Sequence, residues 1–357
     1  MGMMLGVILF LFQERRAAAE TLNLTDTGER RISAPMDPKR IICLGPGTLR
    51  LICYLQAQEK VVGVEDFEKS DPIGRPYLVA NPSLAKLPAV GPGGPAAINK
   101  EPDLEAVLKV RPQVIFIAYM DVNKVEELQK KLQIPIVLLS YGRFATFDEV
   151  VLTSLRLAGK ILNRSKRAEE VISFIQGARN DLLKRTDGFD QAKKPDVYVG
   201  GIGYRGFQGI ESTETSYIPF DWVRAKNLAQ RTNAEGHLFV DKERLLSWNP
   251  EIIFIDGGCL KLIQQDYGKK PEFYETLRAF KEKRVYVLHP YNWYVTNIDT
   301  ALADAYAVGK ILYPERFKDV ETVARADEIY HFLVGKKVTS EMEKDFGVNG
   351  GQAVFGR

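Results

Sequence analysis

Two segments of the chain share one pattern of hydrophobic and polar positions. The first runs from Glu105 to Ile117 and the second from Glu243 to Ile255. In each, a Glu stands seven residues before a Pro, a short stretch with helical character lies between them, and a β-branched and aromatic run follows. Pro ends a helix because it has no N–H and disfavours the α conformation of the residue before it. The run after it predicts a strand buried on both faces of a parallel sheet.

The distance between the two copies favours two similar lobes. Glu105 and Glu243 lie 138 residues apart, which is far beyond the period of a solenoid repeat. Around the first copy, hydrophobic runs predict strands at 40–44, 60–64 and 134–139 and a helix at 49–55 for which Thr48 is the candidate N-cap. We expect an N-terminal lobe over residues 20–144, with a polar arm or hairpin at 20–38.

The next segment has a different pattern. Residues 146–184 contain no Pro, and their apolar positions recur at helical spacing. We expect one long connecting helix over 145–187, with Ser165 as the candidate cap of a restart if the helix breaks near Asn163. At about 1.5 Å per residue it would be roughly 58 Å long, enough to run along two lobes.

The pattern of the first lobe then returns. A strand at 195–199, the second copy of the repeat, a strand at 284–288 and a helix at 299–312 predict a C-terminal lobe over residues 188–315. Residues 316–357 form a helical extension and tail. The predicted fold class is therefore α/β: two Rossmann-like lobes with parallel-type sheets, joined by one long α-helix.

Composition narrows the class of protein. The 357 residues are 45% hydrophobic and 27% charged, with a net charge of +3 and no Lys/Arg cluster, so neither nucleic acid nor a membrane surface is the expected partner. The apolar run Met3 to Phe12 is too short to span a bilayer, and the small residues Ala17 to Ala19 follow it. We expect an export signal at residues 1–19 and a periplasmic or otherwise extracytoplasmic protein.

Candidate catalytic chemistry is sparse. His237, His289 and His331 lie far apart and share no motif, so we expect loop or surface histidines and no metal site. Gly201, Gly203 and Gly206 match GxGxxG after a strand, but the residues after them make a poor helix start. A nucleotide-dependent oxidoreductase using this loop is therefore the weaker alternative to a protein without catalytic activity.

Aromatic and basic side chains gather where the predicted strands end. Ligands of open parallel sheets bind outside the carboxyl ends of the strands, and two facing sheets would enclose a cleft there. Guanidinium groups suit carboxylate, catecholate or hydroxamate oxygens, and aromatic rings supply apolar contact area. For any single tyrosine, packing within its loop is the alternative. The predicted ligand contacts are Pro46, Thr48, Gly93, Tyr119, Tyr141, Arg143, Tyr204, Arg205, Tyr291, Trp293 and Tyr294.

The order of these motifs resembles a known family. The run Arg40 to Leu51, then Val61 to Val64, then Asp103 to Ile117, is similar to the binding proteins of iron-siderophore and vitamin B12 ABC importers. The resemblance covers residues 38–315. It implies lobes joined by a rigid helix, a ligand held between them with little hinge closure, and a Glu on each lobe that pairs with arginines of the importer's membrane subunits.

The resemblance gives the leading functional hypothesis. Glu105 and Glu243 are the positions that match the docking glutamates. We expect a monomeric, non-catalytic carrier without an intrinsic cofactor, which captures a ferric siderophore or a similar metal chelate for an ABC importer. A cobamide, a haem or a directly bound metal ion remain alternative ligands, because the loops 206–214 and 291–297 are not general features of the family.

Overall fold

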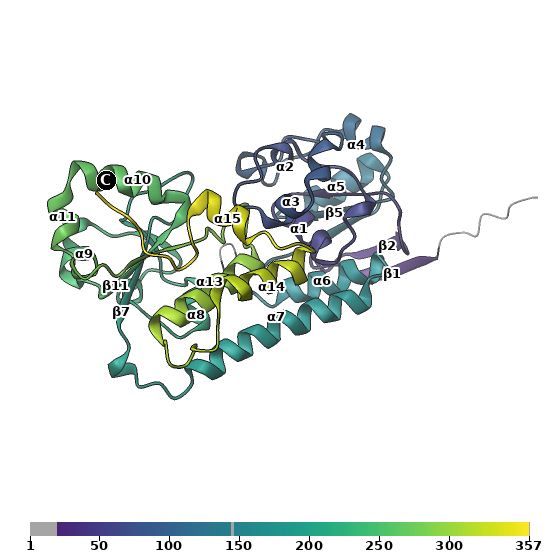
Figure 1. The fold of residues 1–357 in the computed structure, drawn as a ribbon. Coiled ribbons are helices and arrows are strands. Elements are labelled where there is room, and N and C mark those ends of the chain that lie inside the picture. Colours follow the sequence, from purple (N-terminus) through teal and green to yellow (C-terminus); the bar gives the residue numbers. More distant parts are fainter. Residues whose placement is uncertain (1–19, 144–145, 357) are drawn as a thin grey trace, which may run out of the picture.

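Two lobes, each built on a four-stranded parallel sheet, make up the molecule (Figure 1). The computed structural model describes residues 20–143 and 146–356, so the predicted export signal at 1–19 lies outside the described residues. The N-lobe sheet has the order β4-β3-β5-β6 and the C-lobe sheet β12-β11-β7-β9. Their strands are β3 (Ile41–Leu44), β4 (Val61–Gly63), β5 (Val114–Ala118), β6 (Ile136–Leu139), β7 (Asp196–Gly200), β9 (Lys226–Asn227), β11 (Ile252–Asp256) and β12 (Val285–Leu288).

The two sheets have the same topology. Within each parallel sheet the first strand in sequence lies between the second and the third, and the fourth lies outside the third. The predicted fold class is confirmed, since every pair in these two sheets is parallel. All residues of β5 and β11 are buried, which explains why both copies of the sequence repeat read as unbroken hydrophobic runs.

The repeated phrase folds in the same way in both lobes. Helix α4 (Leu104–Val110) precedes β5, and α9 (Lys242–Trp248) precedes β11. Asp103 caps α4 by accepting the Ala106 N–H at 3.0 Å, and Asp241 caps α9 by accepting the Arg244 N–H at 2.6 Å. Each helix ends at a left-handed residue directly before the Pro, Arg111 with φ 46° and Asn249 with φ 45°.

The residue after each Pro also has the same role. The Gln113 side-chain oxygen accepts the Arg40 N–H, and the Glu251 carboxylate accepts the Asp196 N–H. In both lobes this contact joins the start of the first strand of the parallel sheet, β3 or β7, to the repeated unit. The correspondence therefore extends from sequence pattern to individual hydrogen bonds.

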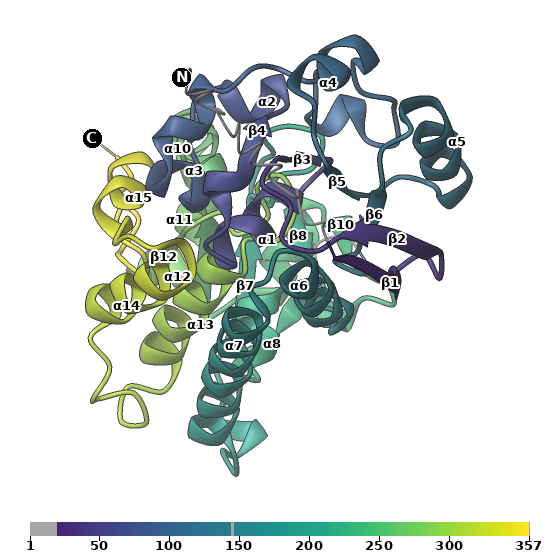
Figure 2. The same cartoon turned by 90° about the vertical axis from the view of Figure 1, so that its right-hand side faces the viewer.

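The connector contains two helices, and the prediction of one helix over 145–187 is wrong. Helix α6 (Val150–Ile161) and α7 (Ser165–Thr186) pack side by side (Figures 1 and 2). The chain reverses at Asn163, which has φ 55°. The helix is therefore interrupted at the position that the sequence analysis considered for a break. Ser165 is the first residue of α7 and not its cap, because Arg164 holds the cap position without a side-chain bond. Of the two connector helices, α7 is the one that runs along both lobes (Figure 1).

The chain ends add elements outside the two sheets. Residues 20–38 form the hairpin of β1 (Thr21–Thr25) and β2 (Arg31–Pro35), one of the two expected arrangements. Helix α14 (Thr322–Val334) packs on α13 (Ile298–Leu312) and also on α1 (Thr48–Tyr54) and α3 (Pro76–Ala80) of the N-lobe. After α15 (Thr339–Phe346), the tail pairs with β12 through a bridge between Gln352 and Tyr286. The C-terminal extension therefore touches both lobes.

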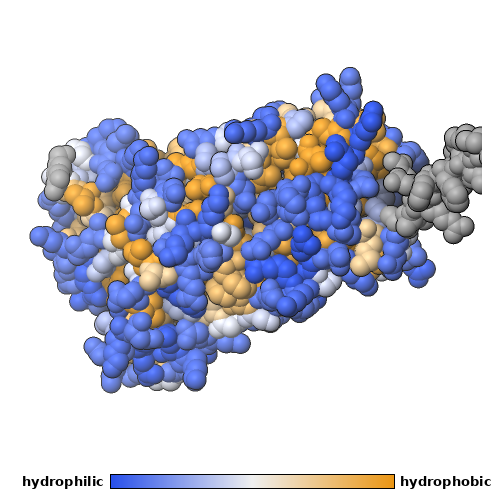
Figure 3. All heavy atoms as spheres, turned by 45° about the vertical axis from the view of Figure 1, so that its right-hand side comes forward, coloured by the Kyte–Doolittle hydropathy of each residue, from blue (hydrophilic) through white to orange (hydrophobic). Residues whose placement is uncertain are grey.

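One hydrophobic core runs through both lobes. Its buried members include Leu51 of the N-lobe, Ile172 of α7 and Phe254 of the C-lobe. A smaller separate core lies under α4 and α5 (Val122–Leu132), and another lies under α9 and the helices that follow it up to α12 (Arg278–Lys281). The face in Figure 3 is covered mainly by hydrophilic residues, with hydrophobic areas between them. Because the lobes share buried apolar surface, moving one against the other would expose part of this core.

Candidate functional site

The cleft cavity lies between the lobes, where loops from the carboxyl ends of their strands meet. Its volume is about 250 Å³. Arg143, from the loop after β6, forms part of the wall that belongs to the N-lobe. The C-lobe contributes the loops after β7 and β12 and the small sheet of β8 (Ser212–Glu214) and β10 (His237–Phe239). The lining residues are Arg143, Thr146, Gly203, Tyr204, Glu214, Glu235, Gly236, His237 and Asn292.

Arg143 and Glu235 form an ion pair across the cleft. Arg143 Nη1 lies 3.3 Å from Glu235 Oε2, and the two side chains are 62% and 86% exposed. At that exposure an ion pair contributes about 0–1 kcal/mol to stability. An anionic ligand can therefore replace Glu235 as the partner of Arg143 at small cost.

Tyr204 and His237 form a stacked aromatic pair in the cavity wall. Their ring centroids are 4.2 Å apart at an interplanar angle of 7°, and the Arg205 guanidinium lies 5.5 Å from the Tyr204 centroid. Phe239 packs edge-on against His237 at 4.9 Å. The rings of Tyr204, Phe207 and Phe239 are 42%, 64% and 56% exposed, so this side of the cleft offers aromatic surface to a ligand.

The hydrogen bonds of Ser212 determine the tautomer of His237. Ser212 Oγ donates its one proton to the Ile202 carbonyl at 2.6 Å and lies 2.7 Å from His237 Nε2. Nε2 must therefore carry the proton and donate it to Ser212 Oγ. Burial lowers the pKa of His237, so the imidazole is neutral at neutral pH and Nδ1 keeps its lone pair.

Glu214 adds a titratable group to the cavity wall. Burial raises the pKa of its carboxyl to about 7, and the charge of Arg143 opposes that shift. Near neutral pH the cavity therefore combines one permanent cation, Arg143, with a carboxyl that changes charge easily.

A smaller hollow lies on the N-lobe side of the cleft. Pro46, Gly93 and Tyr294 are among the residues that line it. Trp293 lies nearby between the lobes: its ring is in close contact with Gly74, and its centroid is 6.4 Å from that of Phe207. Two hydrogen bonds stabilise the loops in this region. Cys259 Sγ accepts the Gln208 N–H at 3.2 Å, and Glu65 Oε1 accepts the Gly45 N–H at 3.0 Å.

Five of the predicted ligand contacts are buried: Pro46, Thr48, Tyr141, Tyr291 and Tyr294. Thr48, Tyr141 and Tyr291 are 0%, 2% and 3% exposed. Thr48 Oγ1 donates to the Leu44 carbonyl at 2.8 Å and the Tyr141 hydroxyl donates to the Gly47 carbonyl at 2.9 Å. Thr48 and Tyr141 therefore support the cleft loops from the core, and direct contact of these side chains with a ligand stays a prediction. Thr48 also does not cap α1, whose N-cap is Gly47.

Several cleft residues have left-handed backbones. Tyr119, Arg205 and Tyr294 have φ of 56°, 52° and 55°. This conformation is unfavourable for residues with a β-carbon and persists where the surrounding structure holds it, which is common at binding sites. Tyr119 is half-buried at the end of β5, so its loop stays among the candidate ligand loops.

The glycine-rich loop after β7 does not form a nucleotide site. The element that follows Gly201, Gly203 and Gly206 is the strand β8 and not a helix. A dinucleotide fingerprint needs a helix N-terminus at this point to bind the pyrophosphate. The oxidoreductase alternative therefore loses its structural basis.

Both candidate docking glutamates point to solvent. Glu105 and Glu243 are exposed in the first turns of α4 and α9. A carboxylate is favoured there by the helix dipole. Their positions in the two lobes are equivalent, as the repeat predicted.

Sequence reasoning missed His237, Glu214 and Asn292 as cavity residues. His237 was expected to be a loop or surface histidine. Its place in the wall depends on the antiparallel pairing of β8 with β10, in which His237 lies opposite Glu214. No local motif in the sequence indicates that pairing.

This fold and this cleft define a two-lobed solute-binding protein. The similarity of the lobes and the cavity between them agree with that class. The chain belongs to the periplasmic binding protein family, whose model matches residues 41–292. It is therefore a non-enzymatic, extracytoplasmic carrier that serves an ABC importer and has no intrinsic cofactor.

Similar proteins support this assignment. The molybdate-binding protein MolA of Haemophilus influenzae is 22% identical over 328 residues, which cover 86% of this chain and 89% of MolA. A periplasmic solute-binding protein from Veillonella parvula has a TM-score of 0.73 at 20% identity, covering 92% of this chain and 97% of its own. The petrobactin-binding protein YclQ of Bacillus subtilis has a TM-score of 0.58 at 16% identity, covering 82% and 99%. The fold is shared, while the solutes named for these proteins differ.

Two further findings concern membranes and metals. Within residues 20–143 and 146–356, every helix is too short or too polar to cross a bilayer. In the same residues, no group of three or more His, Cys, Asp or Glu side chains is placed to hold a metal ion.

Proposed function

We propose that this protein captures a ferric siderophore or a similar anionic metal chelate in the cleft cavity and delivers it to an ABC importer. The observation that carries the proposal is the composition of the wall: Arg143 on one side faces the stacked pair Tyr204–His237 on the other. A chelate of this kind has oxygen atoms for the guanidinium and an organic shell for the aromatic rings.

A bare oxyanion such as molybdate is the second candidate, because MolA is named for it. One feature favours the organic chelate. The exposed rings of Phe207 and Phe239 offer apolar surface that a bare oxyanion cannot use.

Titration of intrinsic fluorescence tests the ligand class, since Trp293 lies between the lobes. The probes are the ferric complexes of a tris-catecholate, a tris-hydroxamate and citrate, with molybdate as the competing class. We expect a saturable change with at least one ferric complex and none with molybdate. Flat titrations with all three ferric complexes would contradict the proposal, and saturation by molybdate alone would favour the oxyanion.

We also propose that Glu105 and Glu243 dock the protein on the membrane subunits of the importer. Replacement of both glutamates by Arg should leave the affinity for the ferric complex unchanged. It should abolish stimulation of importer ATPase activity in proteoliposomes, because the new arginines would meet the expected arginines of the membrane subunits. Glu272, an exposed Glu in the first turn of α11 (Pro271–Thr276), gives the matched control: Glu272→Arg should retain full stimulation. Equal stimulation by the double variant and the wild type would refute the docking role.

A further inference from the structure

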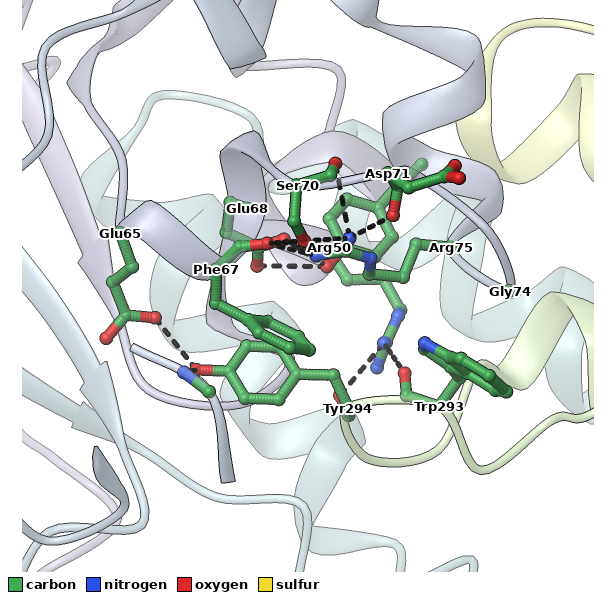
Figure 4. Close-up of polar contacts among 12 residues, drawn as sticks. Arg50, Glu65, Phe67, Glu68, Ser70, Asp71, Gly74, Arg75, Trp293 and Tyr294 are labelled. Carbon is green, nitrogen blue, oxygen red and sulfur yellow. Dashed lines mark hydrogen bonds and ion pairs between the residues drawn. The ribbon is translucent and has the colours of Figure 1, made fainter. Parts of the chain in front are cut away.

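The loop after β12 extends from the C-lobe and is bound by side chains of the N-lobe. We call residues 291–297 the strap. Arg50 on α1 is fully buried, and its guanidinium donates to the carbonyl oxygens of Trp293 at 3.1 Å and Tyr294 at 3.0 Å (Figure 4). It also donates to the carbonyl oxygen of Thr296 at 2.9 Å. A buried guanidinium with three carbonyl acceptors fixes the path of the strap, because leaving it unpaired would be costly.

The strap is held in an unfavourable conformation. Tyr294 and Val295 are consecutive left-handed residues, with φ of 55° and 66°. For a β-branched residue such as Val295 this conformation is rare and unfavourable, so contacts elsewhere must hold it. Those contacts come from the opposite lobe.

Glu65 is the residue on which these contacts converge. Its side chain is buried just before α2 (Asp66–Lys69). Oε1 accepts the Gly45 N–H at 3.0 Å. Oε2 accepts the hydrogen bond of the Tyr294 hydroxyl at 2.9 Å (Figure 4). The Tyr294 oxygen in turn accepts the Gly94 N–H at 3.0 Å. One carboxylate thus joins the loop after β3, the glycine-rich loop at 91–94 and the strap.

The packing around Glu65 leaves little freedom for these loops. A β-carbon on Gly93 would lie 2.5 Å from Glu65 Cβ, so that loop rests directly on the Glu65 side chain. The Tyr294 ring packs against Phe67 with centroids 4.5 Å apart. The three loops are also the ones that line the smaller hollow of the cleft, through Gly45, Gly93 and Tyr294.

We propose that Glu65 is a positioning residue of the ligand cleft: through Gly45 and Tyr294 it fixes three loops from both lobes in one arrangement before a ligand arrives. This inference rests on the proposed function of the cleft. A ligand then meets preformed walls, and its binding energy is not reduced by ordering these loops. Glu65 itself does not need to touch the ligand.

Amide hydrogen exchange of the ligand-free protein tests the arrangement directly. In Glu65→Gln the amide oxygen can accept from only one of the two donors, so exchange at Gly45 and Gly94 should become about tenfold faster. Tyr294→Phe keeps the ring on Phe67 but removes the phenol, and it should speed exchange at Gly94 by a similar factor. The double variant should resemble the single ones, because both act on one network.

The C-lobe offers a matched control. Tyr267 donates to Glu275 at 3.0 Å on an exposed surface. Tyr267→Phe and Glu275→Gln should leave exchange at Gly45 and Gly94 unchanged. Unchanged exchange in both cleft variants, or acceleration spread evenly over the N-lobe, would overturn the proposal. Tyr294→Phe still decides it if Glu65→Gln does not fold.

Affinity separates positioning from a purely structural role. With the ferric tris-catecholate complex as probe, both cleft variants should bind about tenfold more weakly than the wild type, and both control variants should bind equally well. Faster loop exchange with wild-type affinity would refute positioning. If the wild type binds none of the ferric complexes, the proposed function fails, while the exchange experiment still decides whether Glu65 orders the loops.

Discussion

His237 shows how a single side chain acquires a defined role from its neighbours. Because Ser212 already donates to the Ile202 carbonyl, it can only accept from His237 Nε2. The neutral ring therefore has a fixed tautomer with an acceptor at Nδ1, and the parallel Tyr204 ring holds its plane. We expect His237 to contribute to recognition of the ligand.

Replacement of His237 by Ala should weaken binding of the ferric tris-catecholate complex by about tenfold, since it removes a ring of the stacked wall and its polar atoms. Isothermal titration calorimetry gives the dissociation constant. His331, which is exposed on α14, provides the control, and His331→Ala should bind like the wild type. Wild-type affinity in His237→Ala would exclude His237 from the binding surface.

The sequence indicated part of the cleft at the level of residues. Arg143 and Tyr204 were predicted because they follow strands, and the structure brings them to one cavity. Tyr141 and Tyr291 follow strands equally closely but are buried in the core. Position after a strand locates a loop near the cleft, while the direction of each side chain depends on packing that the sequence pattern does not contain.

At the scale of elements, the repeated unit of helix, left-handed residue, Pro and strand was the most predictable part. Hydrophobic runs and the Pro fix it locally, and both copies have the same caps. The connector was less predictable. Helical spacing runs through Asn163 without a Pro, so the pattern alone suggested one helix, although the chain reverses there and α6 packs against α7.

The capping residues of the repeat give a prediction for the two lobes. Asp103→Ala and Asp241→Ala should each lower the free energy of unfolding by about 1 kcal/mol, because each removes one N-cap hydrogen bond. Urea unfolding followed by circular dichroism measures the effect. Glu321, whose side chain makes no capping bond at α14, is the control, and Glu321→Ala should stay within about 0.5 kcal/mol of the wild type. A clear effect in only one lobe would show that the repeats are not energetically equivalent.

For the whole molecule, buried carboxyl groups control the dependence of stability on pH. Burial raises the pKa of Glu65, Glu214 and Asp256 to about 7. Between about pH 4 and pH 7 the folded state holds protons that the unfolded state has released. The free energy of unfolding should therefore fall as the pH rises through this range.

Urea unfolding at about pH 5 and about pH 8 checks this sign, and we expect greater stability at the lower pH. His237 and His289 act in the opposite direction, because burial lowers their pKa values, that of His289 to about 4, but they are two groups against several carboxyls. Glu65→Gln should reduce the difference between the two pH values. Greater stability at pH 8 would contradict the assignment of raised pKa values to these carboxyls.

The shared core, α7, the strap and α14 all join the lobes, so the cleft is expected to be formed before the ligand binds. The sequence predicted two lobes around a cleft, but the strap and the C-terminal extension depend on contacts between residues more than 200 positions apart, such as Arg50 with Thr296. No local pattern encodes such contacts.

The central claim is that the solute is held between the two lobes. Hydrogen-exchange mass spectrometry with and without the ferric tris-catecholate complex tests it most directly. We predict protection of the loops after β6, β7 and β12 together, with little change elsewhere. Saturable binding that protects loops of only one lobe, or peptides away from the cleft, would contradict the account.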